Sequence, residues 1–237
     1  MTAEELANKF REYLGVDLLK SKKPEELLSY YKKIIEEKLL VSIIEYPFKA
    51  DDVRAFSIFS DISVIALNEQ DEPKIKLFSL FHEICHLLKK TSSICSIEIE
   101  KQSQQEIESF CNNFAAEFLV PENDLELEIK KYSVVKEGVS NLSNTYGVSK
   151  QVIMLRLLKL NYIDSTTYVN FKEGFDKELE KKKSGLRRRN WDKVFFNRVG
   201  NLAIREVSNA YKKRDITFFE STRILNLKTK YVEKFID

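Results

Sequence analysis

His82-Glu83-Ile84-Cys85-His86 contains the only two histidines of the 237-residue chain, and a glutamate directly follows the first of them. On an α-helix, residues i and i+4 lie on one face about one turn apart, so both imidazoles can reach one metal ion. Glu83 then projects to one side, where its carboxylate can polarise a water molecule and accept its proton during attack on a carbonyl. The spacing predicts a zinc hydrolase of the peptidase type, with His82 and His86 as metal ligands and Glu83 as the catalytic base.

The segment around this motif predicts a buried helix that begins near Pro73 and ends near Lys90. Asp71 is the expected N-cap, proline suits the first turn, and Lys89 and Lys90 suit the negative end of the helix dipole. Apolar residues surround this helix almost completely, which predicts a central place in the fold. Two imidazoles and a carboxylate are costly to bury there unless a partner such as a metal ion offsets their desolvation.

A second strong helix is expected over residues 103–119, because its apolar residues form one stripe and Pro121 ends it. It follows the first helix after a polar loop, which suits two antiparallel helices. A carboxylate from the second helix would then complete the metal site of the first. The candidates are Glu106, Glu108 and Glu117, and spacing alone does not choose among them.

The remaining patterns predict a helix-rich α+β fold, in which a small three-stranded sheet packs on this helix pair and an all-helical C-terminal region follows. Short β-rich runs separated by turn residues predict strands over 39–44, 55–59 and 64–67. Helical periodicity predicts further helices over 3–14, 24–38, 122–131, 135–145, 149–160, 165–183, 191–213 and 217–234.

Three regions are expected along the chain: an N-terminal helical cap over 1–38, a metallopeptidase-like domain over 39–132, and a helical region over 133–237. A helix-turn-helix-like segment lies near 140–160. Its second helix could read DNA with Lys150, Gln151 and Met154 facing outward, although ordinary packing of a helix pair is favoured.

Composition describes an ordinary protein of mixed charge. Lys and Arg number 39 against 37 Asp and Glu, a net charge of +2 that does not favour nucleic acid as a partner. The dense basic run at 181–189 is expected to be a solvated loop. The acidic start and the absence of a long apolar run predict a cytoplasmic protein with no membrane partner. Cys85, Cys95 and Cys111 form an odd set that suits reduced thiols.

Two stretches together resemble a known family. Residues 78–88 read Phe-Ser-Leu-Phe-His-Glu-Ile-Cys-His-Leu-Leu, and residues 111–121 read Cys-Asn-Asn-Phe-Ala-Ala-Glu-Phe-Leu-Val-Pro. Both are similar to the paired helix motifs of the ImmA/IrrE family of zinc metallopeptidases. The segment 54–68 resembles the strand pair that precedes the first motif. The likeness covers about 40–125, with a weaker continuation over 148–157.

The resemblance implies a thermolysin-like, gluzincin-like zinc domain whose HExxH helix and partner helix form a zincin-type pair. It also implies that the third ligand is Glu108, six residues before the Phe of the Phe-Ala-Ala motif. The choice is compatible with helix geometry, since Glu108, Cys111, Asn112 and Ala115 share one face at i, i+3, i+4 and i+7. Zinc is the implied cofactor, and manganese or another divalent ion is the alternative.

The family also implies a substrate, because its members commonly act on a helix-turn-helix repressor that controls stress-response or mobile-element genes. Many members carry a repressor-like domain of their own before the sheet, whereas this chain has only about 40 residues there. A separate repressor is therefore the expected protein partner. The rival reading is a non-proteolytic zinc-containing regulatory module that binds a repressor or DNA through its C-terminal helices.

Several residues near the motifs have open roles. Cys85 and Cys111 could be soft ligands or redox sensors, but buried inert thiols are favoured. Asn112 could orient a metal ligand through a hydrogen bond or could merely pack on its helix face, and it stays outside the catalytic set. No third histidine exists to stabilise an oxyanion, so a tyrosine, an arginine or a backbone amide must do so.

Overall fold

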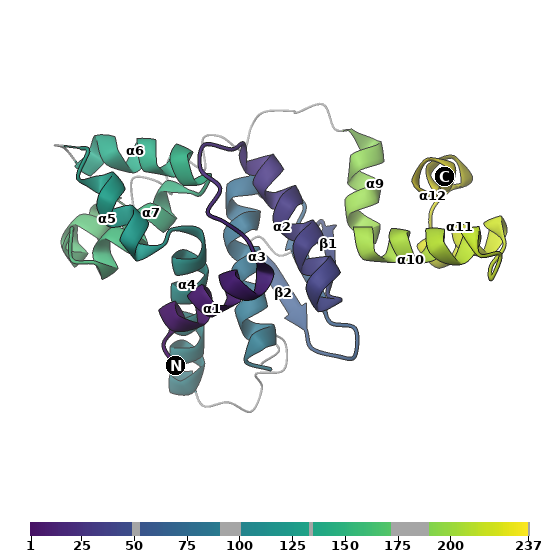
Figure 1. The fold of residues 1–237 in the computed structure, drawn as a ribbon, viewed down its shortest axis with the longest axis horizontal. Helices are drawn as coiled ribbons and strands as arrows, with labels where there is room; N and C mark the ends of the chain where they lie inside the picture. The colour runs from purple at the N-terminus through teal and green to yellow at the C-terminus, as the bar shows by residue number, and fades with distance from the viewer. Residues whose placement is uncertain (49–52, 91–100, 133–134, 172–189, 237) are drawn as a thin grey trace.

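The fold is α+β and helix-rich, with a small three-stranded sheet against a central helix pair (Figure 1). The structure is a computed structural model that describes residues 1–48, 53–90, 101–132, 135–171 and 190–236. Its helices and strands are α1 (Ala3–Leu14), α2 (Pro24–Leu39), β1 (Ser42–Tyr46), β2 (Ala55–Ile58), β3 (Val64–Asn68), α3 (Pro73–Leu88), α4 (Lys101–Leu119), α5 (Glu122–Ile129), α6 (Val135–Tyr146), α7 (Lys150–Lys159), α9 (Trp191–Val199), α10 (Asn201–Lys212), α11 (Phe218–Leu225) and α12 (Thr229–Ile236).

The sheet has the strand order β1-β3-β2, with β1 parallel and β2 antiparallel to β3. The expected strand over 39–44 starts later than the sequence indicated. Leu39 is the last residue of α2, and Leu40 adopts a left-handed conformation at φ 52° that ends the helix. The chain needs this reversal before it can extend, so β1 begins at Ser42.

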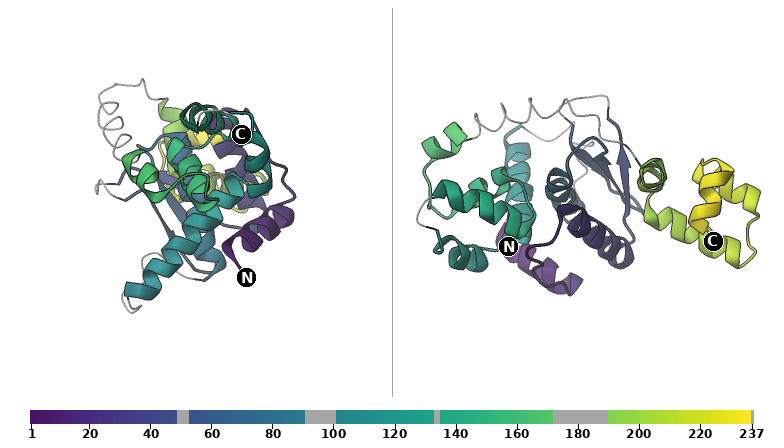
Figure 2. Two further views of the ribbon diagram at one scale, coloured as in Figure 1. Left: turned by 90° about the vertical axis from the view of Figure 1, so that its left-hand side faces the viewer. Right: turned by 90° about the horizontal axis from the view of Figure 1, so that it is seen from above.

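The helices α1 and α2 cover the pair formed by α3 and α4, and the sheet lies on the other side of α3. Seen from above, the strands stand between these helices and the C-terminal helices α9 to α12 (Figure 2, right). The helix α3 is buried over most of its length, as its sequence predicted. Among the described residues, no helix combines the length and apolar character needed to cross a membrane.

Aromatic side chains fill the centre of this core. Phe81 of α3 stacks on Phe118 of α4, with ring centroids 4.0 Å apart and planes 23° apart. Tyr31 of α2 meets Phe81 edge-on at 5.1 Å, and Phe10 of α1 lies 5.8 Å from Phe118. Offset and edge-on ring pairs of this kind add to the free energy of burial. These aromatic contacts join α1, α2, α3 and α4, and they hold α3 and α4 at a fixed separation.

A buried cluster of charges joins α2, β1 and α3. Glu45 of β1 accepts hydrogen bonds from Lys32 Nζ at 3.1 Å and Lys76 Nζ at 2.5 Å, and the three residues are at most 9 % exposed. Burial alone would raise the pKa of Glu45, but the two ammonium groups lower it below its ordinary value. The carboxylate stays ionised and fixes the sheet against α3.

The outer edge of β1 is covered by the junction between α9 and α10. Ser42 N bonds to Ser63 O, so the next residue, Ile43, turns its N–H and carbonyl away from β3. The buried Glu36 accepts a hydrogen bond from Ile43 N at 3.2 Å and another from Asn201 Nδ2 at 3.2 Å. A β-carbon at Gly200 would lie 3.1 Å from Ile43 O, so the edge is closed by backbone as well.

Two helices that the sequence predicted as continuous are each broken in two. The helix expected over 191–213 is interrupted at Gly200, whose φ of 87° and ψ of 144° leave helical geometry as the chain meets β1. The helix expected over 217–234 is interrupted at Asn226, which is left-handed at φ 51°. Glycine and asparagine adopt such angles at low cost, and packing decides where they are used.

Two other details of the sequence-based picture need correction, and some predictions cannot be compared with the structure. Asp71 does not cap α3, because Glu72 is the N-cap and Asp71 instead accepts a hydrogen bond from Arg54 Nη1 at 2.5 Å. Met154 is 2 % exposed, so it does not face outward on α7 as the DNA-reading alternative required, and the favoured packing of the helix pair agrees with its burial. Cys95, the run at 181–189 and the second half of the helix expected over 165–183 lie outside the described residues.

Buried residues of the described chain form two cores. The larger includes residues from Ala3 in α1 to Leu157 in α7, and the smaller includes residues of α10, α11 and α12, from Ile204 to Ile236. The three regions over 1–38, 39–132 and 133–237 stay a prediction. The helices α5, α6 and α7 share the core of α3 and α4, whereas α10 to α12 have a core of their own.

The buried ion pair between Arg156 and Glu117 is expected to be a main support of the larger core. Arg156 is fully buried, donates from Nε to Val120 O at 3.0 Å, and pairs with the 2 %-exposed Glu117. Arg156→Ala leaves that carboxylate buried without its main partner, which should cost about 3–5 kcal/mol. Urea unfolding followed by circular dichroism measures this loss.

Lys159→Ala on the same helix is the matched control, because its pair with Glu4 is partly solvated. It should change the free energy of unfolding by less than about 1 kcal/mol. Equal effects of the two substitutions would contradict the structural role assigned to Arg156.

Candidate metal centre

The two helices α3 and α4 run antiparallel and bring three ligand-type side chains to one point. The contacts pair His82 with Asn112 and His86 with Glu108, so residue numbers rise along one helix as they fall along the other. His82 Nε2 and His86 Nε2 are 3.1 Å apart. Glu108 Oε2 lies 3.2 Å from His82 Nε2, and Glu108 Oε1 lies 3.4 Å from His86 Nε2.

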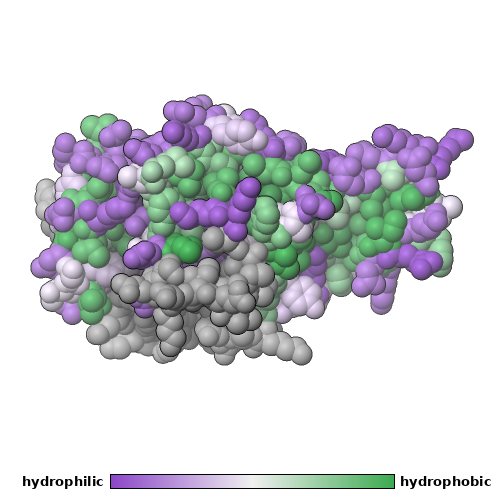
Figure 3. All heavy atoms as spheres, turned by 90° about the horizontal axis from the view of Figure 1, so that it is seen from below, coloured by the Kyte–Doolittle hydropathy of each residue, from purple (hydrophilic) through white to green (hydrophobic). Residues whose placement is uncertain are grey.

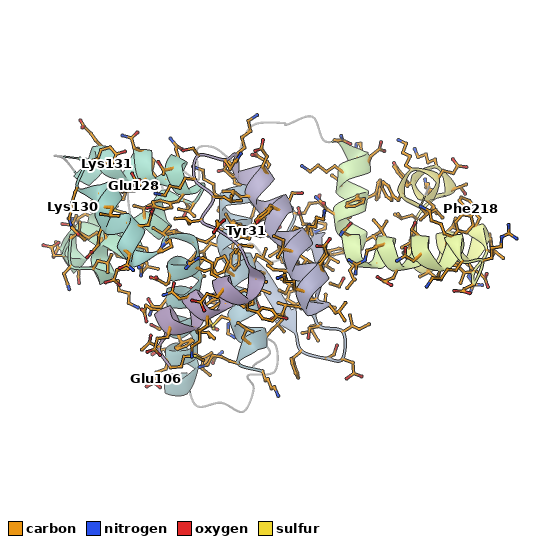
Figure 4. All side chains as sticks on the ribbon, in the orientation of Figure 1. Tyr31, Glu106, Glu128, Lys130, Lys131 and Phe218 are labelled. Atoms are coloured by element: carbon orange, nitrogen blue, oxygen red, sulfur yellow. The ribbon has the colours of Figure 1, made fainter. Side chains whose placement is uncertain are left out.

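Only one of the three candidate glutamates reaches the histidines. Glu108 forms the cluster with His82 and His86 and is about half exposed. Glu117 is buried two turns further along α4, where Arg156 holds it. Glu106 is exposed and lies toward the outer end of α4, away from α3 (Figure 4). The structure thus brings Glu108 to the histidines and places the other two elsewhere.

Glu83 lies beside this cluster in a buried position and points toward the sheet. Ser57 of β2 donates a hydrogen bond from Oγ to Glu83 Oε2 at 2.7 Å, and Ser57 and Glu83 are 0 % and 4 % exposed. The bond fixes the carboxylate in one orientation. Ser57 was not singled out from the sequence, where its one signal is a hydroxyl at an inward position of an otherwise apolar strand.

Both histidines also have hydrogen-bond partners on α4. His82 Nδ1 and Asn112 Oδ1 are 3.0 Å apart, so the amide oxygen can accept the Nδ1–H and leave Nε2 with a free lone pair. Of the two roles left open for Asn112, the structure shows the hydrogen bond. His86 is hydrogen-bonded to the side chain of Cys111. Adjacent residues of α4 therefore hold the two imidazoles.

Cys85 and Cys111 are completely buried free thiols, as the sequence analysis favoured, and no ligand-type cluster in the described chain includes them. Their side chains are hydrogen-bonded to each other across the α3–α4 contact. That bond and burial raise the pKa of the Cys111 thiol far above its usual range, so it stays protonated.

The electrostatics of the cluster favour a cation. Burial opposes charge on His86, yet hydrogen bonds with Cys111 and Glu108 raise its pKa to about 10. Hydrogen bonds from His82 and His86 hold the pKa of Glu108 well below its usual range. The carboxylate is thus ionised, and a positive charge between the rings, either a proton or a metal ion, is stabilised.

The spacing of these atoms suits zinc. Ligand atoms about 2.0–2.1 Å from a tetrahedral zinc ion are about 3.3 Å from one another. The three contacts in the cluster measure 3.1, 3.2 and 3.4 Å. Two imidazole nitrogens and one carboxylate are also the ligand set of a catalytic zinc site, in which one position stays open. The residues present fit such an ion without rearrangement of the helices.

The chain belongs to the ImmA/IrrE family: residues 36–158 match the family model of the IrrE N-terminal-like domain, Peptidase M78. The match includes the sheet, the helix pair and the helices through α7. It confirms the resemblance that the two motifs carried and points to a peptidase-type hydrolase, in a family whose members are typically metal-dependent.

Among solved structures, the chain is similar to a Mycobacterium tuberculosis transcriptional regulator, with a TM-score of 0.50 and 13 % sequence identity. The alignment covers 66 % of this chain and 46 % of that chain, so the likeness spans less than half of that protein. At this identity the likeness shows the fold alone. No curated protein matches the sequence.

The hydrogen bond from His82 to Asn112 is expected to strengthen metal binding. Asn112→Ala removes the acceptor that fixes the ring and its tautomer, so Zn²⁺ affinity should fall about 10- to 100-fold. Competition with a chromophoric chelator measures the dissociation constant. Asn113→Ala is the matched control, since Asn113 is the same residue type one position further along α4. Similar affinities for the two variants would argue that Asn112 only packs.

Proposed function

We propose that the chain is a zinc-dependent metallo-endopeptidase that hydrolyses peptide bonds. The observation that carries the proposal is the cluster of His82, His86 and Glu108, with Glu83 held beside it by Ser57. His82, His86 and Glu108 would hold the ion. Zinc, when bound, would polarise the scissile carbonyl and lower the pKa of a water molecule.

Glu83 would carry the proton through the reaction. Its carboxylate accepts a proton from the attacking water as the oxygen adds to the peptide carbonyl, and it then passes that proton to the leaving amine nitrogen. The hydrogen bond from Ser57 leaves Glu83 Oε2 engaged, which restricts the carboxylate to one plane. Such orientation supports proton transfer, because the base must meet the water at hydrogen-bond distance.

The strand β2 is the proposed binding surface for the substrate backbone. It lies at an edge of the sheet, packs on α3, and carries Ser57 next to Glu83. No described strand pairs with its outer edge, whereas the outer edge of β1 is covered by Gly200 and Glu36. An extended segment of a substrate can add to β2 through backbone hydrogen bonds, which would allow cleavage of an exposed loop.

The proposed substrate is a separate helix-turn-helix transcriptional repressor, and its cleavage would release genes of a stress response or a mobile element. This part rests on the resemblance to the ImmA/IrrE family, and a cytoplasmic place of action belongs to the same proposal. The competing proposal is a zinc-containing regulatory module that binds a repressor or DNA without cutting. Cleavage is the observation that separates them.

Incubation with a helix-turn-helix repressor encoded next to the gene of this chain tests the peptidase proposal. The wild-type protein with zinc should produce discrete fragments, visible by mass spectrometry. Glu83→Gln should abolish them while metal binding persists, because the amide cannot accept the proton. Ser57→Ala should slow cleavage less severely than Glu83→Gln. The peptidase proposal would be wrong if the repressor bound the wild type and both variants equally and was never cut.

Metal content tests the ligand set directly. The purified wild-type protein should contain close to one zinc ion per chain by elemental mass spectrometry, and manganese would be recognised in the same measurement. His82→Ala and Glu108→Ala should lose most of it, whereas Glu106→Gln, on the same helix but outside the cluster, should keep it. Full metal content in Glu108→Ala would remove Glu108 from the site.

A further inference from the structure

The helices α10, α11 and α12 form a separate unit of the structure, away from the candidate metal site. Their buried residues make a separate core, and all three helices lie beyond the residues that match the family. The unit is attached to the outer edge of β1, on the other side of the sheet from α3 and α4 (Figure 2). No residue of this unit contributes to the cluster of His82, His86 and Glu108.

The geometry of this unit is that of a helix-turn-helix. Thr217 opens α11 with a capping box, and Asn226 ends it in a left-handed conformation. Only three residues, Asn226 to Lys228, separate α11 from α12. In Figure 1 α11 lies across the view while α12 is seen end-on, so the helices cross at a large angle. The helix α10 packs against both, as the third helix of such a domain does.

The first turn of α12, the second helix of the pair, is exposed to solvent. Val232 and Ile236 face the small core, whereas Thr229 and Lys230 are exposed. Lys228, just before the helix, is exposed as well. In a helix-turn-helix, this first turn of the second helix is the part that enters the major groove of DNA.

Net charge, counted from the sequence, distinguishes this unit from residues 1–171. Residues 1–171 contain 21 Lys and Arg against 27 Asp and Glu, whereas residues 200–236 contain 8 Lys and Arg against 4 Asp and Glu. Hydrophilic side chains line the rim of this lobe in Figure 3. The exposed cations are Lys212, Lys213, Arg214, Arg223, Lys228, Lys230 and Lys234. The near-neutral charge of the whole chain therefore combines an acidic excess in residues 1–171, the acidic body, with a basic excess in the residues that follow, which include this unit.

From this geometry and charge we propose that α10–α12 is a DNA-binding helix-turn-helix, with Lys228, Thr229 and Lys230 of the α12 start at the major groove. Backbone phosphates match the exposed cations of the unit, and the acidic body would be kept away from the duplex by repulsion. The segment near 140–160 is a poorer candidate, because Met154 and Arg156 of α7 are buried in the main core. The proposal does not depend on proteolysis.

Fluorescence anisotropy of a labelled duplex of about 30 base pairs, titrated with the full chain, tests the proposal. The wild type should bind at about 50 mM salt, and its affinity should fall linearly with salt on a double-logarithmic plot. Lys228→Ala/Lys230→Ala should weaken binding about tenfold or more at that salt concentration. The slope should fall by about 2, because each lysine that enters the groove lies close to phosphates and displaces about one counterion.

Lys33→Ala/Lys130→Ala is the matched control, because both lysines are exposed and belong to the acidic body; Lys130 is at the far side from α12 (Figure 4). It removes the same charge and should bind like the wild type. Far-ultraviolet circular dichroism checks that each variant keeps the helical content of the wild type.

Three results would overturn the proposal. The first is no binding of duplex by the wild type at about 50 mM salt. The second is equal affinity of the wild type and Lys228→Ala/Lys230→Ala, which would place any contact elsewhere. The third is tighter binding of a single-stranded RNA of the same length, since the start of α12 would then not be reading a groove of DNA.

Discussion

The antiparallel contact between α3 and α4 is the constraint on which the rest of the structure depends. Two imidazoles and a carboxylate meet there within a largely apolar helix pair, and their close, fixed approach offsets the cost of burying them. The stacked rings of Phe81 and Phe118 set the separation of the two helices. Cys111 and Asn112 set the orientation of the two imidazole rings. A shift of either helix along the other would separate all of these contacts at once.

The two edge strands of the sheet make different contacts with this helix pair. Glu45 binds Lys32 and Lys76 and locks β1 to the helices, while β2 supplies the hydroxyl of Ser57 to Glu83. One edge strand is thus structural, and the other faces the candidate chemistry. The helices α9 and α10 close the structural edge at β1, whereas the outer edge of β2 has no partner among the described strands.

The sequence was informative wherever a local pattern determines structure. Periodicity and end signals predicted α1, α3 and α4 closely, and the spacing of His82, Glu83 and His86 placed three site residues on one helix. Glu108 could not be chosen by spacing, since Glu106 and Glu117 share its helix, and the resemblance to the family made that choice. The structure separates the three through contacts with α3 and α7, which no local pattern contains.

Features that depend on distant parts of the chain could not be predicted. The breaks at Gly200 and Asn226 exist because the chain must turn along β1 and around the small core, and a helical periodicity continues through both. The bond between Ser57 and Glu83 joins residues 26 positions apart, and the ion pair of Glu117 with Arg156 spans 39. In each case the partner is selected by packing rather than by neighbours in sequence.

Closure of the β1 edge by Gly200 and Glu36 also limits where a further strand can add to this sheet. A sheet with two open edges can extend without limit, because each added strand exposes a new edge for the next molecule. Here the chain caps one end of its own sheet with a helical lobe, so a pair of molecules joined through β2 would have no described edge left to offer. Gly200, which interrupts a helix, thereby also helps to prevent further strands from adding to β1.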